Sequence, residues 1–187
     1  MRRGTKRVSS IYASNWKRPS CCYKRQLSVE YEPEQLGRAR SPDFAVSFTT
    51  SLSFMVEVTR LRADQRNTSP IGERLADTIC TKLGQLLPQR SNVLLVGVEA
   101  PNLTPSDLRT TMLRIQQRAE RGDATFLRRH RFRDRADFFR HYQRLSEIVV
   151  RGTPLQAGDP VAIWVNPGAK HPLSTKVRTA LSRSHTL

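Results

Sequence analysis

Residues 41–61 read SPDFAVSFTTSLSFMVEVTRL, two apolar runs separated by a short polar stretch. Each run is rich in β-branched and aromatic residues, which favour extended strands. The stretch therefore predicts two neighbouring strands, with Asp43 opening the first and Glu57 in the middle of the second. A carboxylate inside an apolar strand is costly unless it is paired, protonated or bound to a cation. Two acids on adjacent strands would suit a hard divalent cation.

The spacing of these acids resembles a nuclease signature. Pro42-Asp43, thirteen residues and then Glu57-Val58-Thr59 are similar to the motif of the PD-(D/E)XK nuclease superfamily, whose fold is restriction-endonuclease-like. In that family the motif reads Pro-Asp, a variable gap, then Asp or Glu, any residue and Lys. Thr59 stands where the family has its Lys, so the resemblance is to a divergent member.

The resemblance implies a metal site. In the family, the acids equivalent to Asp43 and Glu57 hold one or two Mg²⁺ ions, with help from a backbone carbonyl, here that of Val58; Mn²⁺ is the alternative ion. Such a cation lowers the pKa of a bound water and stabilises charge on the phosphate. In some members an extra acid completes the site, a role open to Glu30 or Glu32. The structural alternative is that Asp43 caps a turn and Glu57 pairs with a neighbouring Arg.

The charge missing at Thr59 can come from the helix predicted over residues 70–87. Thr59 can form hydrogen bonds but carries no charge. Lys82 lies three residues after Ile79, on or beside the apolar stripe of that helix, and members of the family relocate the Lys to this helix. Lys82 is therefore the first candidate for the charged catalytic group, and Gln85 is a weaker helper. Alternatively, the stem of Lys82 packs while its ammonium stays in water.

The order of the remaining segments predicts an α/β fold, a small mixed β-sheet flanked by helices. Residues 27–32 form an alternating strand, Thr68-Ser69-Pro70 starts the helix with a capping hydroxyl, and residues 92–98 form a buried strand. Strand, strand, strand, helix, strand matches the superfamily core over residues 26–99. Its opening helix is degenerate or missing, because residues 1–25 have no helical periodicity.

The second half of the chain adds further elements to this core. Thr104 to Gly122 predicts a capped amphipathic helix, and a short helix carries Phe138 and Tyr142. Two final strands are expected at residues 148–150 and 161–165, joined by a loop.

The formal charge of +16 is concentrated at the two ends of the chain. Residues 1–25 hold eight Lys or Arg and residues 168–187 hold four, and neither segment has an acid. We therefore expect a single α/β domain over residues 26–167, between a basic, disordered N-terminal arm and a basic C-terminal tail. Such arms attract polyanions, first of all nucleic acid.

A second basic feature is the segment of residues 114–135, which holds eight Arg and three acids. The planar guanidinium of Arg can donate two hydrogen bonds to one phosphate, and Phe126 and Phe132 are interleaved with the arginines. The alternative is a solvated basic loop and helix face. The candidate nucleic-acid-binding residues are Arg128, Arg129, Arg131 and Arg133.

Three cysteines, Cys21, Cys22 and Cys80, have neither zinc-ligand nor disulfide-framework spacing, which favours a reducing cytoplasm. No apolar run approaches the ~20 residues that span a bilayer, and the basic N-terminus lacks the apolar core of a secretory signal. We expect a cytoplasmic protein without a membrane partner; an organelle transit peptide is the alternative for the N-terminus.

Together these features favour a divergent, Mg²⁺-dependent nuclease-like protein that acts on the phosphodiesters of DNA or RNA. Two alternatives stay open: a catalytically inactive nucleic-acid-binding module, and a protein-interaction module with basic arms. The sequence leaves the oligomeric state open, a homodimer included.

Overall fold

The computed structural model describes residues 28–31, 33, 42–61, 69–99, 103–152 and 160–183. These residues form an α/β fold with a mixed six-stranded sheet, which confirms the predicted mixed sheet flanked by helices. In chain order the elements are β1 (Ser28–Tyr31), β2 (Phe44–Thr49), β3 (Leu52–Leu61), α1 (Ile71–Leu83), β4 (Asn92–Val98), α2 (Pro105–Glu120), α3 (Ala124–Arg129), α4 (Arg135–Tyr142), β5 (Leu145–Gly152), β6 (Ala162–Val165) and α5 (Thr175–Arg183).

The strands lie in the sheet in their sequence order. β1, β2 and β3 pair antiparallel, β3, β4 and β5 pair parallel, and β6 returns antiparallel to β5. Parallel neighbours need a long crossover, which α1 supplies between β3 and β4, and α2 to α4 supply between β4 and β5. The continuous apolar run of β4 follows from its central place between β3 and β5.

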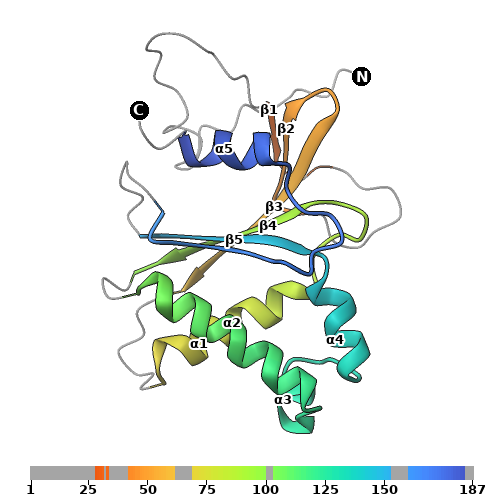
Figure 1. Ribbon diagram of the computed structural model, residues 1–187, viewed down its shortest axis with the longest axis vertical. Coiled ribbons are helices and arrows are strands. Elements are labelled where there is room, and N and C mark those ends of the chain that lie inside the picture. Colours follow the sequence, from red (N-terminus) through yellow and green to blue (C-terminus); the bar gives the residue numbers. More distant parts are fainter. Residues whose placement is uncertain are drawn as a thin grey trace, which may run out of the picture.

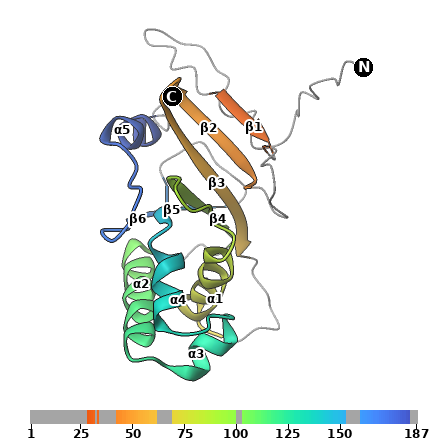
Figure 2. The ribbon, with the colours of Figure 1, turned by 90° about the vertical axis from the view of Figure 1, so that its right-hand side faces the viewer.

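The sheet separates two helical layers of unequal size (Figures 1 and 2). Helices α1 to α4 cover one face, where the larger core contains Leu75, Leu94 and Ile148. Helix α5 lies on the other face, where Leu173 and Val177 pack against Val46, Phe54 and Val93. Helix α5 lies within residues 168–187, where the sequence indicates only a basic tail.

Two helix starts differ in how they are capped. The predicted cap of α2 is confirmed: Thr104 accepts from the backbone of Asp107, whose carboxylate bonds back to Thr104, in a capping box. The predicted hydroxyl cap of α1 is wrong. Pro70 itself occupies the cap position, without a side-chain cap, and its carbonyl accepts from the N–H groups of Glu73 and Arg74.

Candidate functional site

Asp43 and Glu57 lie on neighbouring strands at corresponding positions. Phe44 of β2 is opposite Val56 of β3 in the antiparallel register. Asp43 precedes Phe44 and Glu57 follows Val56, so the same register, carried one residue further, sets the two acids opposite each other. Directly opposed residues share a face of the sheet and have Cβ atoms roughly 4.5–5.5 Å apart. The predicted pairing of the two acids on adjacent strands agrees with this register.

Glu57 is buried, with 6% of its surface exposed, on the face of the sheet that α1 covers. Lys82, in the last turn of α1, places its Nζ 2.6 Å from Glu57 Oε1 and donates to Gln85 Oε1 at 2.9 Å. The lysine side chain is 20% exposed, so its ammonium lies against the carboxylate and not in bulk water. Of the two structural alternatives, pairing of Glu57 with an Arg is therefore wrong: the partner is a lysine from α1.

The chain path explains this contact. Helix α1 connects β3 to the parallel strand β4, so it must run back across the sheet, and its last turn ends near the start of β4. Glu57 is opposite Leu94, the third residue of β4, so it lies near the start of that strand. An ammonium there compensates a carboxylate that would otherwise be buried without a partner.

Asp43 is half-buried and is anchored by the backbone of β3. Its Oδ2 accepts a hydrogen bond from the Val58 N–H at 2.7 Å. This bond orients the carboxylate at the start of β2, beside Glu57. The contact of Val58 with the site is through its N–H; the carbonyl of Val58 as a metal ligand stays a prediction. Thr59 is half-buried, two residues beyond Glu57 on the same face of β3.

The carboxylates of Asp43 and Glu57 are the donors that a divalent cation would meet at this site. Among the described residues, no group of three or more His, Cys, Asp and Glu side chains could hold a metal ion. Two carboxylates on adjacent strands nevertheless fit Mg²⁺, which keeps several waters and takes one or two protein carboxylates together with substrate phosphate. Glu30 lies opposite Ala45, on the same face as the two acids, and is exposed. Glu32 lies outside the described residues.

The four predicted nucleic-acid-binding arginines lie elsewhere. Arg129 pairs with Asp77 of α1, and Arg133 Nη2 lies 3.2 Å from Asp137 Oδ1. Arg128 and Arg131 are exposed. Helix α3 lies at the end of the molecule opposite β1 and β2 in Figures 1 and 2. The structure therefore does not bring this segment to the acids.

Helix geometry accounts for the separation. Asp77, which meets α3, and Lys82, which meets β3, are five residues apart on α1. At 3.6 residues per turn, their side chains point about 140° apart around the helix axis. The aromatic residues interleaved in the arginine segment are also used internally: Phe126 and Phe132 are buried in the larger core, with their rings near Phe138.

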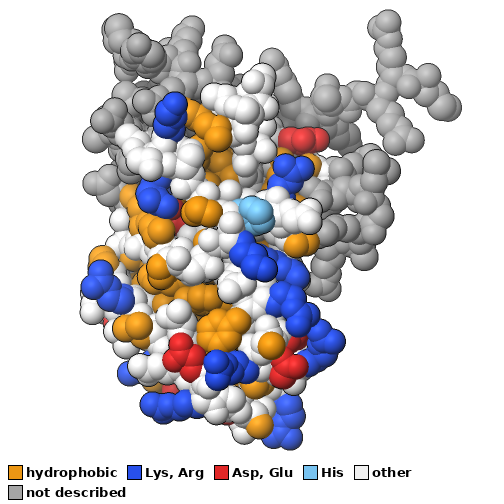
Figure 3. Space-filling model, turned by 45° about the vertical axis from the view of Figure 1, so that its right-hand side comes forward, with side chains coloured by type: hydrophobic (Ala, Val, Ile, Leu, Met, Phe, Trp, Pro, Cys, Tyr) orange, Lys and Arg blue, Asp and Glu red, His pale blue; other side chains and the backbone are white. Residues whose placement is uncertain are grey.

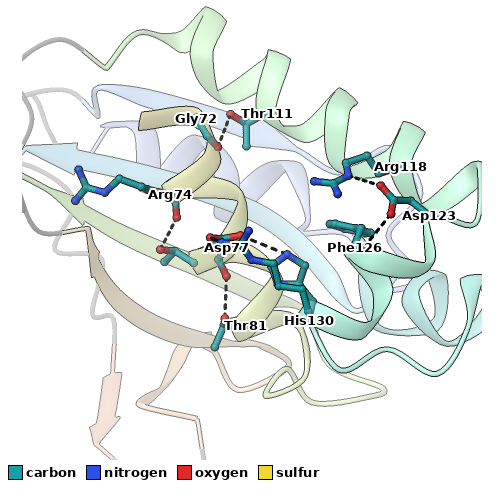
Figure 4. A network of polar contacts seen from close by, with 11 residues as sticks. Gly72, Arg74, Asp77, Thr81, Thr111, Arg118, Asp123, Phe126 and His130 are labelled. Atoms are coloured by element: carbon teal, nitrogen blue, oxygen red, sulfur yellow. Dashed lines mark hydrogen bonds and ion pairs between the residues drawn. The ribbon is translucent and has the colours of Figure 1, made fainter. Parts of the chain in front are cut away.

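A cavity of about 200 Å³ lies between α1, α2 and α3. Figure 4 shows His130 pointing toward Asp77, and Arg118 toward Asp123. Burial lowers the pKa of His130, although the Asp77 carboxylate opposes the shift. Asp77 thus pairs with Arg129 and lies near His130, and the cavity contains neither Asp43 nor Glu57.

A second carboxylate is buried on the opposite face of the sheet. Glu147, the third residue of β5, has 1% of its surface exposed, and Arg178 of α5 donates to its Oε2 at 3.2 Å. Burial raises the pKa of Glu147, and the Arg178 guanidinium opposes that rise. The sequence holds a signal for this pair, because an acid next to the apolar run Ile148-Val149-Val150 resembles the acid within an apolar strand at Glu57.

Comparison of the chain with protein-family models, with curated proteins and with solved structures finds no match. No helix in the part of the chain that the structure describes is both long and apolar enough to cross a membrane.

Proposed function

We propose that the protein is a divergent, metal-dependent nuclease of the PD-(D/E)XK type, acting on nucleic-acid phosphodiesters. The observation that carries the proposal is the contact between Lys82 and Glu57, 2.6 Å long. Thr59 leaves the motif without its positive charge, and α1 returns a lysine to the motif acid. A lysine that only served solubility would not be held beside a buried carboxylate in the last turn of a packed helix.

The order of elements supports the same reading. β1, β2, β3, α1 and β4 follow one another as strand, strand, strand, helix and strand, the order expected for the superfamily core without its first helix. Asp43 directly precedes the second of these strands and Glu57 lies in the third, which agrees with the motif. The restriction-endonuclease-like core remains part of the proposal.

Each side chain has a role in this proposal. Asp43 and Glu57 would hold Mg²⁺, which when bound supplies Lewis acidity toward the phosphate and a water of lowered pKa. The Lys82 ammonium has three N–H donors; Glu57 and Gln85 take two of them, and the third can meet a phosphate oxygen or the attacking water. The Val58 N–H holds the Asp43 carboxylate in place before substrate binds.

Metal-dependent cleavage tests the proposal. Purified protein is incubated with labelled DNA and RNA in Mg²⁺ or Mn²⁺, beside Glu57→Gln and the matched control Glu120→Gln, which changes an exposed glutamate at the end of α2. We expect cleavage by the wild type and by the control, and a rate lower by about 100-fold or more for Glu57→Gln. Cleavage that survives Glu57→Gln would assign the activity to other residues.

A second candidate is a catalytically inactive nucleic-acid-binding module, favoured by Thr59 at the motif position and by the engagement of Glu57 with Lys82. This module binds nucleic acid with a steep salt dependence and leaves it uncut. A protein-interaction module with basic arms, the third possibility, binds nucleic acid weakly and captures an acidic protein.

A further inference from the structure

Three loops at the start of β4 and β5 are joined around one buried asparagine. We call residues 84–91, 143–146 and 166–174 the loop cluster. Asn92 has 2% of its surface exposed, and its Nδ2 donates to the carbonyls of Leu87, Arg90 and Arg144 at 2.8–2.9 Å. Its Oδ1 accepts from the Leu87 N–H at 3.2 Å. One side chain thus fixes two of the loops relative to each other.

The third loop is attached to the other two by further hydrogen bonds. The Ser146 hydroxyl accepts from the Asn92 N–H at 2.9 Å and donates to the His171 carbonyl at 2.7 Å. The Lys170 N–H donates to the Gln143 carbonyl at 2.9 Å. The backbones that carry Arg90 and Lys170 are therefore held in one arrangement.

The loop cluster is basic and contains no acid. Its titratable residues are Arg90, Arg144, Lys170 and His171, without any Asp or Glu. Arg90 and Lys170 are exposed. Figure 3, which brings the right-hand side of Figure 1 forward, shows Lys and Arg side chains gathered along this side of the molecule. By contrast, two of the four arginines around α3 are paired with Asp77 and Asp137.

The loop cluster is also next to the candidate acids. The Ser91 carbonyl accepts from the Met55 N–H at 2.8 Å, and Glu57 is two residues further along β3, roughly 6–7 Å away. Gln85, at the beginning of the first loop, contacts Lys82. A chain of phosphates that reaches Lys82 would therefore have the exposed loop residues within a few nucleotides.

We propose that the sugar-phosphate backbone of a nucleic acid crosses the loop cluster, with Arg90 and Lys170 contacting phosphates on the way to Lys82. This inference rests on the proposed nuclease function, whose substrate path it specifies. Loops fixed in advance by Asn92 and Ser146 lose little conformational entropy on binding. The surface that binds the substrate is then not the arginine segment around α3.

Equilibrium binding separates the two surfaces. The test variant is Arg90→Gln/Lys170→Gln, and the matched control is Arg128→Gln/Arg131→Gln, which removes the same charge from exposed positions around α3. A fluorescent 20-base-pair duplex is titrated in EDTA over a range of salt concentrations. We expect the test variant to bind about tenfold more weakly, with a salt slope smaller by about 1.8, since each phosphate contact contributes ~0.9. We expect the control to stay within about twofold of the wild type. Thermal melts check that both variants are folded.

Other binding results overturn the inference. If the control loses as much affinity as the test variant, or more, the phosphates follow α3 or contact no defined surface. If polyglutamate competes as well as the duplex, the loop cluster is a docking surface for an acidic protein. Binding is measured in EDTA, which removes divalent cations, so cleavage does not affect the result. A wild type that binds through the loops and never cuts in Mg²⁺ leaves the path of the nucleic acid standing and ends the nuclease proposal. A test variant that binds the duplex and cuts nucleic acid like the wild type overturns the substrate path and leaves the nuclease proposal standing.

Discussion

Lys82 Nζ and Glu57 Oε1 lie 2.6 Å apart between the last turn of α1 and the middle of β3, with 20% and 7% of their side chains exposed. Their positions are 25 residues apart in the chain, and only the crossover from β3 to β4 brings them together. This contact should contribute to stability, and under the proposed function also to catalysis, because it places a positive charge beside the buried acid of the strand.

Lys82→Ala should destabilise the fold. The change leaves a buried carboxylate without its cation, and we expect a loss of about 2–3 kcal/mol in the free energy of unfolding, somewhat less than for a fully buried pair because part of the lysine is exposed. Urea denaturation measures the difference. Lys176→Ala, at an exposed position of α5, should change stability by less than about 0.5 kcal/mol.

The double variant Glu57→Gln/Lys82→Met gives the complementary result. It removes both charges and keeps side chains of similar length, so we expect it to recover most of the stability that Lys82→Ala loses. A double variant as unstable as Lys82→Ala would mean that lost packing, and not an uncompensated charge, sets the cost.

Asn92→Ala should loosen the loop cluster. Three backbone carbonyls and one N–H lose their partner. A buried polar group that is left without a hydrogen bond costs about 1–3 kcal/mol. We expect about 3 kcal/mol of destabilisation and faster proteolysis within residues 84–91. The control Gln117→Ala, on the exposed face of α2, should leave both measurements close to the wild type. Protection of the loop from protease in Asn92→Ala would contradict the role given to this side chain.

The burial of Glu147 predicts a dependence of stability on pH. The pKa of this carboxyl is raised in the folded state, so its contribution is most favourable below the ordinary value of 4.5 and is lost as pH rises through the raised pKa. Glu147→Gln removes the titration. We therefore expect the free energy of unfolding of Glu147→Gln, relative to wild type, to increase from pH 4 to pH 7. A difference that falls over this range would show that Arg178 outweighs desolvation.

The sequence predicted the sheet well where alternation and capping were strong. The two strands over residues 41–61 and the capped start at Thr104 depend on local interactions, which neighbouring residues determine. The position of Lys82 could also be predicted, because a helical stripe fixes which face a residue takes. Its partner could be suggested only through the resemblance, since no local rule joins residues 25 positions apart.

The misses have a common physical cause. The sequence did not show that Arg129 pairs with Asp77 and Arg133 with Asp137; binding of phosphates by the arginines around α3 stays a prediction. Helix α5 was missed because its described contacts with the sheet come from Val177 and from Leu173 just before the helix, which are surrounded by polar residues in the sequence. Asn92 gave no signal at all, because a buried amide that bonds to loop carbonyls leaves no periodic pattern.

The most direct test of the central claim moves the lysine. If Lys82 supplies the charge that the motif lacks at Thr59, then Lys82→Ala should cut nucleic acid in Mg²⁺ about 100-fold more slowly than wild type, and Thr59→Lys/Lys82→Ala should recover at least tenfold of that loss. Thr59 is on the same face of β3 as Glu57, so a lysine there can reach the same carboxylate. Cleavage by Lys82→Ala at the wild-type rate, or no recovery in a folded double variant, would contradict the account.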